Sequence, residues 1–267
     1  MTPYSHDLIA QLSKLPEVEA IAIGGSQASG RATPGSDVDL YVLTADAIPT
    51  NVRRGIANEL ADDPAEIEIA NPYWGDEDGY AIDGVWHDIV FFDSGWFLDE
   101  IARATVRHEA REGYSTSFVF TLVNMQPIFD PMAIVTTAKA MLPEYPGALT
   151  TAIIARNFPV ACGIHASYRN QIARAVALND AVALNHRVAA FLACVFDIAF
   201  ASLRMWHPGE KRQLQYLDAR RDDLPAGFTG AIRRVVDSCT AQGMGDIMAA
   251  VDDVVAGLTE MVQTKPS

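Results

Sequence analysis

The chain has few cysteines, no long apolar run and few positive charges. Its 267 residues include three cysteines, Cys162, Cys194 and Cys239, which are scattered along the chain. This number and spacing suit reduced, mostly buried thiols and argue against a disulfide framework or a zinc site. No stretch of about 18 uninterrupted apolar residues is present, so we expect no membrane span. The first residues lack the basic and apolar blocks of a signal peptide, which predicts a cytoplasmic protein.

Positive charge is scarce. The chain holds 20 lysines and arginines against 34 aspartates and glutamates, which gives a formal net charge of −14. The stretch from Gly55 to Ala102 has neither Lys nor Arg. Binding of DNA or RNA needs a basic surface that displaces counterions, so we expect no nucleic-acid partner. The acidic residues form either a solvated face or a negative field that attracts a cationic substrate.

The first half of the chain alternates short β-rich runs with helical ones. The predicted strands are 18–23, 37–43, 65–70, 84–92 and 126–129, and the predicted helices are 6–15, 50–60 and 96–112. Such alternation indicates a sheet covered by helices, so we predict a small mixed β-sheet domain of the α+β class.

The second half has a different pattern. Two prolines and a glycine within 143–147 mark a natural boundary, because these residues break helices. Beyond them, apolar residues recur at helical spacing over 150–178, 180–206 and 227–258, with a break expected near Pro159. We therefore predict two domains, 1–142 and 143–267, of which the second is an all-α helical bundle.

Two glycines and a serine, Gly24-Gly25-Ser26, follow the first predicted strand. Glycine adopts positive φ and lets backbone N–H groups approach a phosphate closely. A helix that begins near Ser26 would add the positive end of its dipole. The segment lacks the lysine and hydroxyl residue of a P-loop, because Arg31-Ala32 stands in their place. A tight structural turn is the alternative interpretation.

Two aspartates lie one residue apart in the next predicted strand, within Ser36-Asp37-Val38-Asp39-Leu40. Side chains alternate along a strand, so Asp37 and Asp39 are predicted to share a face. Neighbouring carboxylates repel each other unless a cation lies between them, and Mg²⁺ prefers carboxylate and phosphate oxygens. An edge strand with one wet face is the alternative.

A third carboxylate lies in the predicted strand 84–92. Asp88 has large apolar neighbours there, where an unpaired charge is costly. Coordination of a metal ion would offset that cost. Pairing with an arginine or a position at a strand end is the alternative. Asp93, at the end of the run, is the second choice for this role.

Together these segments resemble the polymerase-β-type nucleotidyltransferase superfamily. The resemblance rests on the strand and Gly-Gly-Ser turn at 18–26, on residues 36–40 and on the apolar strand around Asp88. It is closest to small bacterial antibiotic adenylyltransferases of the aminoglycoside and lincosamide type. Ile128-Phe129-Asp130-Pro131 resembles the strand that closes the catalytic domain, and residues 206–212 resemble a Pro-x-x-Lys segment of some members.

The resemblance implies a reaction and roles for its carboxylates. Asp37 and Asp39 would bind two Mg²⁺ ions, and Asp88 would hold the metal near the attacking hydroxyl. A nucleoside monophosphate, AMP from ATP or another NTP, would pass to a hydroxyl of a small-molecule acceptor with release of pyrophosphate. The acidic composition favours a cationic antibiotic as the acceptor.

The resemblance also implies the residues that bind the nucleotide. Gly25 and Ser26 would hold the β- and γ-phosphates, and Ser36 is also predicted to bind the nucleotide. Lys211 would reach the triphosphate from the helical domain, although it is also a plausible surface cation at a helix start.

Some alternatives stay open from the sequence. Roles in the site for His87, Glu109, Arg31 and Arg169 are undecided, and His87 is expected to face away from Asp88 on its strand. Transfer of the nucleotide to a protein, in a toxin–antitoxin or regulatory system, is one alternative function. A non-catalytic nucleotide-binding module is another.

Overall fold

The computed structural model describes residues 4–25, 36–71, 75–240 and 244–263. The chain divides into two compact units. Unit 1 comprises Met1–Ile101 and Thr121–Leu142, and unit 2 comprises Ala102–Phe120 and Pro143–Ser267. Residues 102–120 thus pack with unit 2, although they precede the boundary expected from the sequence. The predicted domains, 1–142 and 143–267, stay a prediction.

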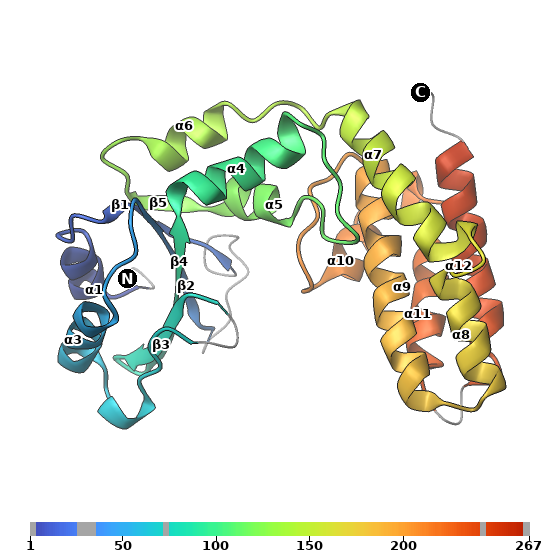
Figure 1. Cartoon of the computed structure of the whole chain (residues 1–267), viewed down its shortest axis with the longest axis horizontal. Coiled ribbons are helices and arrows are strands. Elements are labelled where there is room, and N and C mark those ends of the chain that lie inside the picture. Colours follow the sequence, from blue (N-terminus) through green and yellow to red (C-terminus); the bar gives the residue numbers. More distant parts are fainter. Residues whose placement is uncertain (1–3, 26–35, 72–74, 241–243, 264–267) are drawn as a thin grey trace. The chain divides into compact units, whose positions relative to one another are not determined.

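Unit 1 is built on a mixed sheet with the strand order β3-β4-β2-β1-β5 (Figure 1). These strands are β1 (Val18–Ile23), β2 (Val38–Thr44), β3 (Glu77–Ile82), β4 (Val85–Asp93) and β5 (Gln126–Phe129). The central strands β2 and β4 run parallel, whereas the other neighbouring pairs are antiparallel. This arrangement confirms the predicted α+β class, with a small mixed sheet flanked by helices.

One face of this sheet is covered by α1 (His6–Leu12) and α3 (Thr50–Leu60), which lie side by side next to the sheet (Figure 1). We call it the covered face. Alternate apolar side chains of the strands point to this face and pack against both helices, because each strand directs every second residue to the same side. The buried cluster includes Leu8, Ile9 and Leu12 of α1, Ile56 and Ala57 of α3, and Ile21, Leu40, Val42, Ile89 and Phe91 of the strands.

The residues between these core positions form the opposite face, which we call the carboxylate face. It carries Asp39 and Tyr41 of β2 and Trp86 and Asp88 of β4, all of them half-buried. The same alternation of the two strands therefore buries one set of side chains and leaves polar groups accessible on the other side.

Two details of unit 1 differ from the sequence prediction. The predicted strand 65–70 is wrong: a 3₁₀ turn covers Pro64–Glu66, and a single bridge joins Glu68 to Gly79. The strand that pairs there with β4 is β3, which the sequence analysis did not predict because Glu77-Asp78-Gly79 has a composition typical of loops.

The helices around the end of unit 1 also differ from expectation. The predicted helix 96–112 is shorter and covers α4 (Ser94–Thr105), and the chain beyond it has a positive φ of 55° at His108. Two further helices, α5 (Ser117–Asn124) and α6 (Ile134–Ala140), were not predicted. Both are short, so their apolar spacing extends over only about two turns.

Unit 2 is helical, as predicted for the second half of the chain. Its α-helices are α7 (Gly147–Phe158), α8 (Tyr168–Ala177), α9 (Ala181–Ser202), α10 (Gln213–Asp218), α11 (Phe228–Asp237) and α12 (Ile247–Gln263). A π-helical turn at Pro159–Gly163 follows α7, at the proline where a break was expected. The predicted helix 227–258 is instead the two helices α11 and α12.

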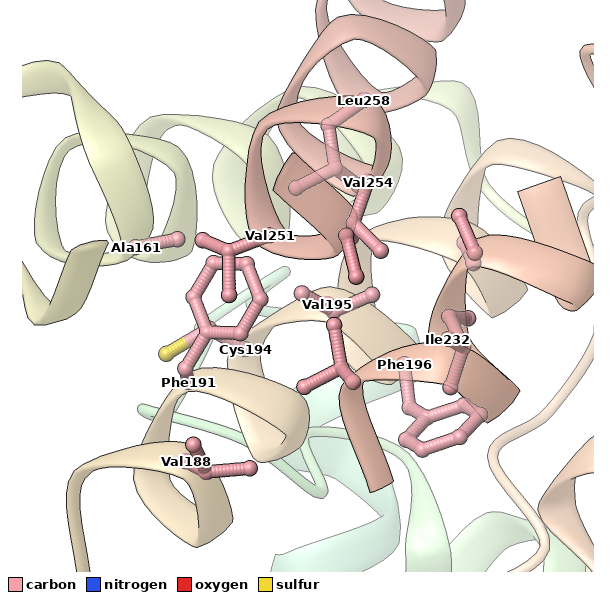
Figure 2. Packing of buried hydrophobic residues seen from close by; sticks show 14 of the residues in the cluster. Ala161, Val188, Phe191, Cys194, Val195, Phe196, Ile232, Val251, Val254 and Leu258 are labelled. Carbon is pink, nitrogen blue, oxygen red and sulfur yellow. The ribbon is translucent and has the colours of Figure 1, made fainter. Parts of the chain in front are cut away.

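Helix α9 lies at the centre of the hydrophobic core of unit 2. Its Phe191 and Val195 pack with Val251 and Val254 of α12 (Figure 2). By length and composition alone, 147–177 and α9 are apolar enough to cross a membrane. The central helix of a packed bundle passes the same test, and many residues of α9 are buried in this core. The absence of a membrane partner stays a prediction.

Candidate functional site

Asp39 and Asp88 lie side by side on the carboxylate face. Strands β2 and β4 are parallel neighbours, and their register pairs Asp39 with Asp88. Val38 and His87, one residue earlier on each strand, are also paired and are buried on the covered face. Because paired residues of neighbouring strands direct their side chains to the same side, the two carboxylates share one face of the sheet.

The third predicted metal ligand, Asp37, lies just before this strand. β2 begins at Val38, and Asp37 is exposed. Of the two aspartates that were expected to share this strand, β2 therefore includes Asp39 and begins one residue after Asp37. Among residues 4–25, 36–71, 75–240 and 244–263, no group of three or more His, Cys, Asp or Glu side chains is placed to hold a metal ion. The structure brings together two of the three predicted carboxylates, and the metal role of all three stays a prediction.

The glycine turn lies directly against Asp39. Gly25 has a φ of +57°, and a Cβ added to it would lie 1.7 Å from Oδ2 of Asp39. A Cβ on Gly24 would lie 2.1 Å from the ring of Tyr41, and the Gly24 N–H donates to the Asp39 carbonyl at 2.9 Å. Only residues without a side chain fit here, so the two glycines let the backbone approach the carboxylate. Ser26 lies outside the described residues.

Asp88 is held by a neighbouring tryptophan. The indole N–H of Trp86 donates to Oδ1 of Asp88 at 2.7 Å. Trp86 is two residues before Asp88 on β4, so both side chains lie on the carboxylate face. Opposite them on β3, Gly79 pairs with Asp88, and a Cβ on Gly79 would lie 2.7 Å from Cζ2 of Trp86.

Burial and the negative charge of this face raise the pKa values of neighbouring residues. Burial raises the pKa of Tyr41 to about 12, and the charges of Asp39 and Asp88 contribute to the rise. The pKa of Glu77 is also raised, first by partial burial and then by Asp88 and Glu68. Each added negative charge is therefore disfavoured here, which is the condition under which a carboxylate face attracts a cation.

Two further residues, Ser36 and Lys211, were predicted to bind the nucleotide. Ser36 is half-buried and lies just before Asp37 at the start of β2. Lys211 is an exposed residue of unit 2, two positions before the start of α10. Nucleotide binding by Gly25, Ser26, Ser36 and Lys211 stays a prediction.

Four further residues were left undecided by the sequence. His87 is buried on the covered face, where its Nε2 accepts the Ser5 N–H and burial lowers its pKa. It therefore faces away from Asp88, as expected. Glu109 is exposed and lies 3.5 Å from Nε of Arg107.

Arg169 of α8 is engaged within unit 2, where its Nε lies 2.7 Å from Oδ1 of Asp252. Arg31 lies outside the described residues.

Sequence reasoning missed Trp86, Gly79 and Tyr41 as neighbours of the carboxylates. The spacing of Trp86 to Asp88 and of Tyr41 to Asp39 was available, because residues two apart in a strand share a face. The contribution of Gly79 depends on β3, which was not predicted.

Comparison with known proteins relates the N-terminal part of the chain to one family. Residues 6–77 match the family model described as polymerase beta, nucleotidyltransferase. The match contains Gly25, Asp37 and Asp39 and ends before β4, which carries Asp88. No curated protein matches the chain.

A solved structure of a nucleotidyltransferase-like protein from Exiguobacterium sibiricum 255-15 is similar, with a TM-score of 0.46 and 13% identity. The similarity covers 96% of this chain and 72% of the other. The family match therefore identifies residues 6–77 as part of a nucleotidyltransferase domain of the polymerase-β type, and a helical region follows later in the chain.

Proposed function

We propose that the protein transfers a nucleoside monophosphate, AMP from ATP, to a hydroxyl of a small-molecule acceptor. A bond forms between the acceptor oxygen and the α-phosphorus, the bond from this phosphorus to the pyrophosphate oxygen breaks, and the hydroxyl proton passes to water. The observation that supports this reaction best is the pairing of Asp39 with Asp88 beside the Gly24-Gly25 turn.

The residues of this face suit a divalent metal ion. Carboxylate oxygens are the protein ligands that Mg²⁺ prefers. Asp39 and Asp88 would hold the ion, with Asp37 as the third candidate at the start of the strand. Bound there, Mg²⁺ would stabilise negative charge on the reacting phosphate and favour the ionised acceptor hydroxyl.

The surrounding residues would orient the two substrates. Gly25 places backbone without a side chain next to Asp39, so N–H groups of the turn would bind a phosphate that is also held by the metal ion on Asp39. Ser26, Ser36 and Lys211 are the proposed further contacts to the triphosphate. Binding the nucleotide in a fixed position contributes to the rate by lowering the entropy lost on reaction.

A cationic acceptor, such as an aminoglycoside-like polyamine, is the favoured substrate class. The pKa of Glu77 is raised first by partial burial and then by the charges of Asp88 and Glu68 on the same part of unit 1. A positively charged ligand would relieve this repulsion, whereas a nucleic acid would add to it. The proposal therefore includes neither a nucleic acid nor a membrane as partner, and we propose a cytoplasmic location.

The proposal is tested with labelled nucleoside triphosphates, Mg²⁺ and a panel of hydroxylated acceptors. We expect pyrophosphate release that requires both an acceptor and Mg²⁺ and is fastest with ATP. Asp39→Asn should lower the rate at least ~1,000-fold, because a bound metal contributes several kcal/mol of charge stabilisation. Asp46→Asn, at an exposed position just beyond the other end of β2, is the matched control and should keep the wild-type rate.

The alternatives give different results in the same experiment. Labelling of a protein without any acceptor would indicate that the target is a protein. Tight ATP binding without pyrophosphate release would indicate a non-catalytic module. Equal rates for Asp39→Asn and wild type would show that the carboxylate face is not the site.

A further inference from the structure

The hydrogen bond from Trp86 to Asp88 has a specific geometry. The donor is the neutral indole N–H, 2.7 Å from Oδ1. Within the part of the chain that the structure describes, Oδ2 of Asp88 accepts no hydrogen bond and no Lys or Arg pairs with this carboxylate. One oxygen is thus fixed by the protein, while the other keeps its capacity for an external ligand.

The indole has its place because β3 carries a glycine opposite Asp88. A Cβ at Gly79 would lie 2.7 Å from Cζ2 and 3.3 Å from Cε2 of Trp86. Real side-chain contacts do not reach 2.7 Å, so any other residue at position 79 would displace the ring. Gly79 is itself fixed on both sides, by pairing with Asp88 and by hydrogen bonds of 2.9 and 3.0 Å with the backbone of Glu68.

We propose that Trp86 is a positioning residue that orients the Asp88 carboxylate for a divalent cation, and that Gly79 makes this orientation possible. The inference rests on the proposed function, because it assigns the cation to the same pair of carboxylates. A neutral donor suits this role: it fixes the rotation of the carboxylate but leaves its negative charge, which a lysine or arginine would cancel.

Residues that hydrogen-bond to a metal-binding carboxylate contribute strongly to the affinity of the site for the metal ion. Loss of such a partner typically weakens metal binding by about 10- to 100-fold. The direction of the effect is informative. If Trp86 only filled space, Trp86→Phe would lower stability and leave the affinity for the ion unchanged.

The experiment measures Mn²⁺ binding to the full chain without nucleotide, from the electron paramagnetic resonance signal of free Mn²⁺. We expect Trp86→Phe to bind Mn²⁺ about 10-fold more weakly than wild type. Gly79→Ala should weaken binding similarly, because its Cβ displaces the indole. Trp96→Phe is the matched control, since Trp96 is an exposed tryptophan of α4. It should keep the wild-type affinity.

Fluorescence gives a second, independent readout. Mg²⁺ binding at Asp88 should change the emission of the indole bonded to it. We expect this change in wild type and Trp96→Phe and its loss in Trp86→Phe. Far-UV circular dichroism and the melting temperature identify any variant that fails to fold. If Trp86→Phe does not fold, the Mn²⁺ affinity of Gly79→Ala, which retains Trp86, decides the question.

Two reference variants separate this inference from the proposed function. If Asp39→Asn and Asp88→Asn bind Mn²⁺ as tightly as wild type, the carboxylate face is not a metal site and both proposals fail. If they lose binding while folded Trp86→Phe and Gly79→Ala keep it, the proposed function survives and the role of Trp86 is overturned. Tighter binding by Trp86→Phe would also overturn it.

Discussion

The two faces of the sheet in unit 1 treat their carboxylates differently. On the covered face, Asp78 of β3 is 3% exposed, and its Oδ1 lies 2.7 Å from a guanidinium nitrogen of Arg53. The same oxygen accepts the Ala70 N–H at 2.9 Å. On the carboxylate face, half-buried Asp88 accepts a hydrogen bond from neutral Trp86, and no cation among the described residues pairs with it.

This difference separates a structural acid from a candidate functional one. A buried carboxylate that a guanidinium neutralises is satisfied by the fold and has little to offer to a ligand. A carboxylate that is oriented by a neutral donor keeps its charge, and its repulsion from neighbouring acids favours an added cation. The interpretation predicts that substitutions on the covered face change stability, whereas substitutions on the carboxylate face change activity.

The largest expected effect is on the covered face. Arg53 of α3 is buried, contacts Asp76 and Asp78, and lies 4.2 Å from the ring centroid of Phe91. Arg53→Met leaves Asp78 buried without its partner, which should lower the free energy of unfolding by about 3–5 kcal/mol. Urea denaturation followed by circular dichroism measures the change.

The neighbouring residue provides the control for this prediction. Arg54 is exposed on the same helix, so Arg54→Met should alter the free energy of unfolding by about 0.5 kcal/mol or less. Equal stabilities of the Arg53 and Arg54 variants would show that buried Asp78 does not depend on its ion pair with Arg53.

The next effect is on the carboxylate face. In Gly25→Ala the new Cβ would lie 1.7 Å from Oδ2 of Asp39, so the carboxylate must move. A displacement of about 1 Å in a catalytic group can lower a rate about 100-fold, and we expect at least this loss of nucleotide transfer. The positive φ at Gly25 adds a stability loss of only about 1–2 kcal/mol.

Gly55→Ala is the matched control. Gly55 lies within α3, has open space around its Cα and does not have a positive φ. The substitution should leave the transfer rate unchanged and stabilise the helix by about 0.5–1 kcal/mol. If Gly25→Ala transfers nucleotide as fast as Gly55→Ala, the glycine turn does not shape the site.

The sequence predicted the strands of this site but not their register. Apolar alternation located β1, β2 and β4 to within a residue or two, because one face of each strand is buried. The pairing of Asp39 with Asp88 depends on the long connection between β2 and β4. No local pattern determines how such a connection sets the register, so the adjacency of the two carboxylates required the structure.

The errors in unit 1 have a common physical cause. Residues 65–70 alternate like a strand, but within this described segment a single β-bridge, from Glu68 to Gly79, takes the place of a strand. β3 contains Glu77, Asp78 and Gly79, which disfavour strands locally, and it is held by β4 and by the ion pair of Asp78 with Arg53. Tertiary contacts override local preference at both places, and both border Trp86 and Asp88.

A carboxylate of unit 2 differs from both Asp78 and Asp88, because neutral donors hold it although it is fully buried. Asp197 of α9 is 1% exposed and accepts the Ser115 N–H at 3.0 Å, the Ser115 hydroxyl at 2.6 Å and the Asn157 side-chain amide at 3.1 Å. Both oxygens are engaged. Neutral donors therefore do not by themselves indicate a functional acid. The distinguishing feature is Oδ2 of Asp88, which accepts no hydrogen bond from the residues that the structure describes.

The smallest predicted effect is the pH dependence of this buried acid. Burial raises the pKa of Asp197 to about 6, although the hydrogen bonds from Ser115 and Asn157 act against the rise. An unfolded aspartate has a pKa of about 3.9, so between the two values the folded state binds more protons than the unfolded state. Stability contributed by Asp197 is therefore present at low pH and is lost as the pH rises, by about 2 kcal/mol between pH 4 and pH 6.

This loss is measured as a difference between wild type and Asp197→Asn, which cannot titrate at this position. Denaturant unfolding at several pH values should show that the free energy of unfolding falls by about 2 kcal/mol more in the wild type than in the variant over this interval. The contributions of other titrating groups cancel in this difference. Parallel pH profiles would mean that the three donors stabilise the charged carboxylate enough to offset its burial. In that case, the hydrogen bonds from the three donors, rather than burial, would determine the pKa of Asp197. Donors reach both oxygens of Asp197, whereas the Trp86 indole reaches Oδ1 of Asp88, and this difference would then distinguish the two acids.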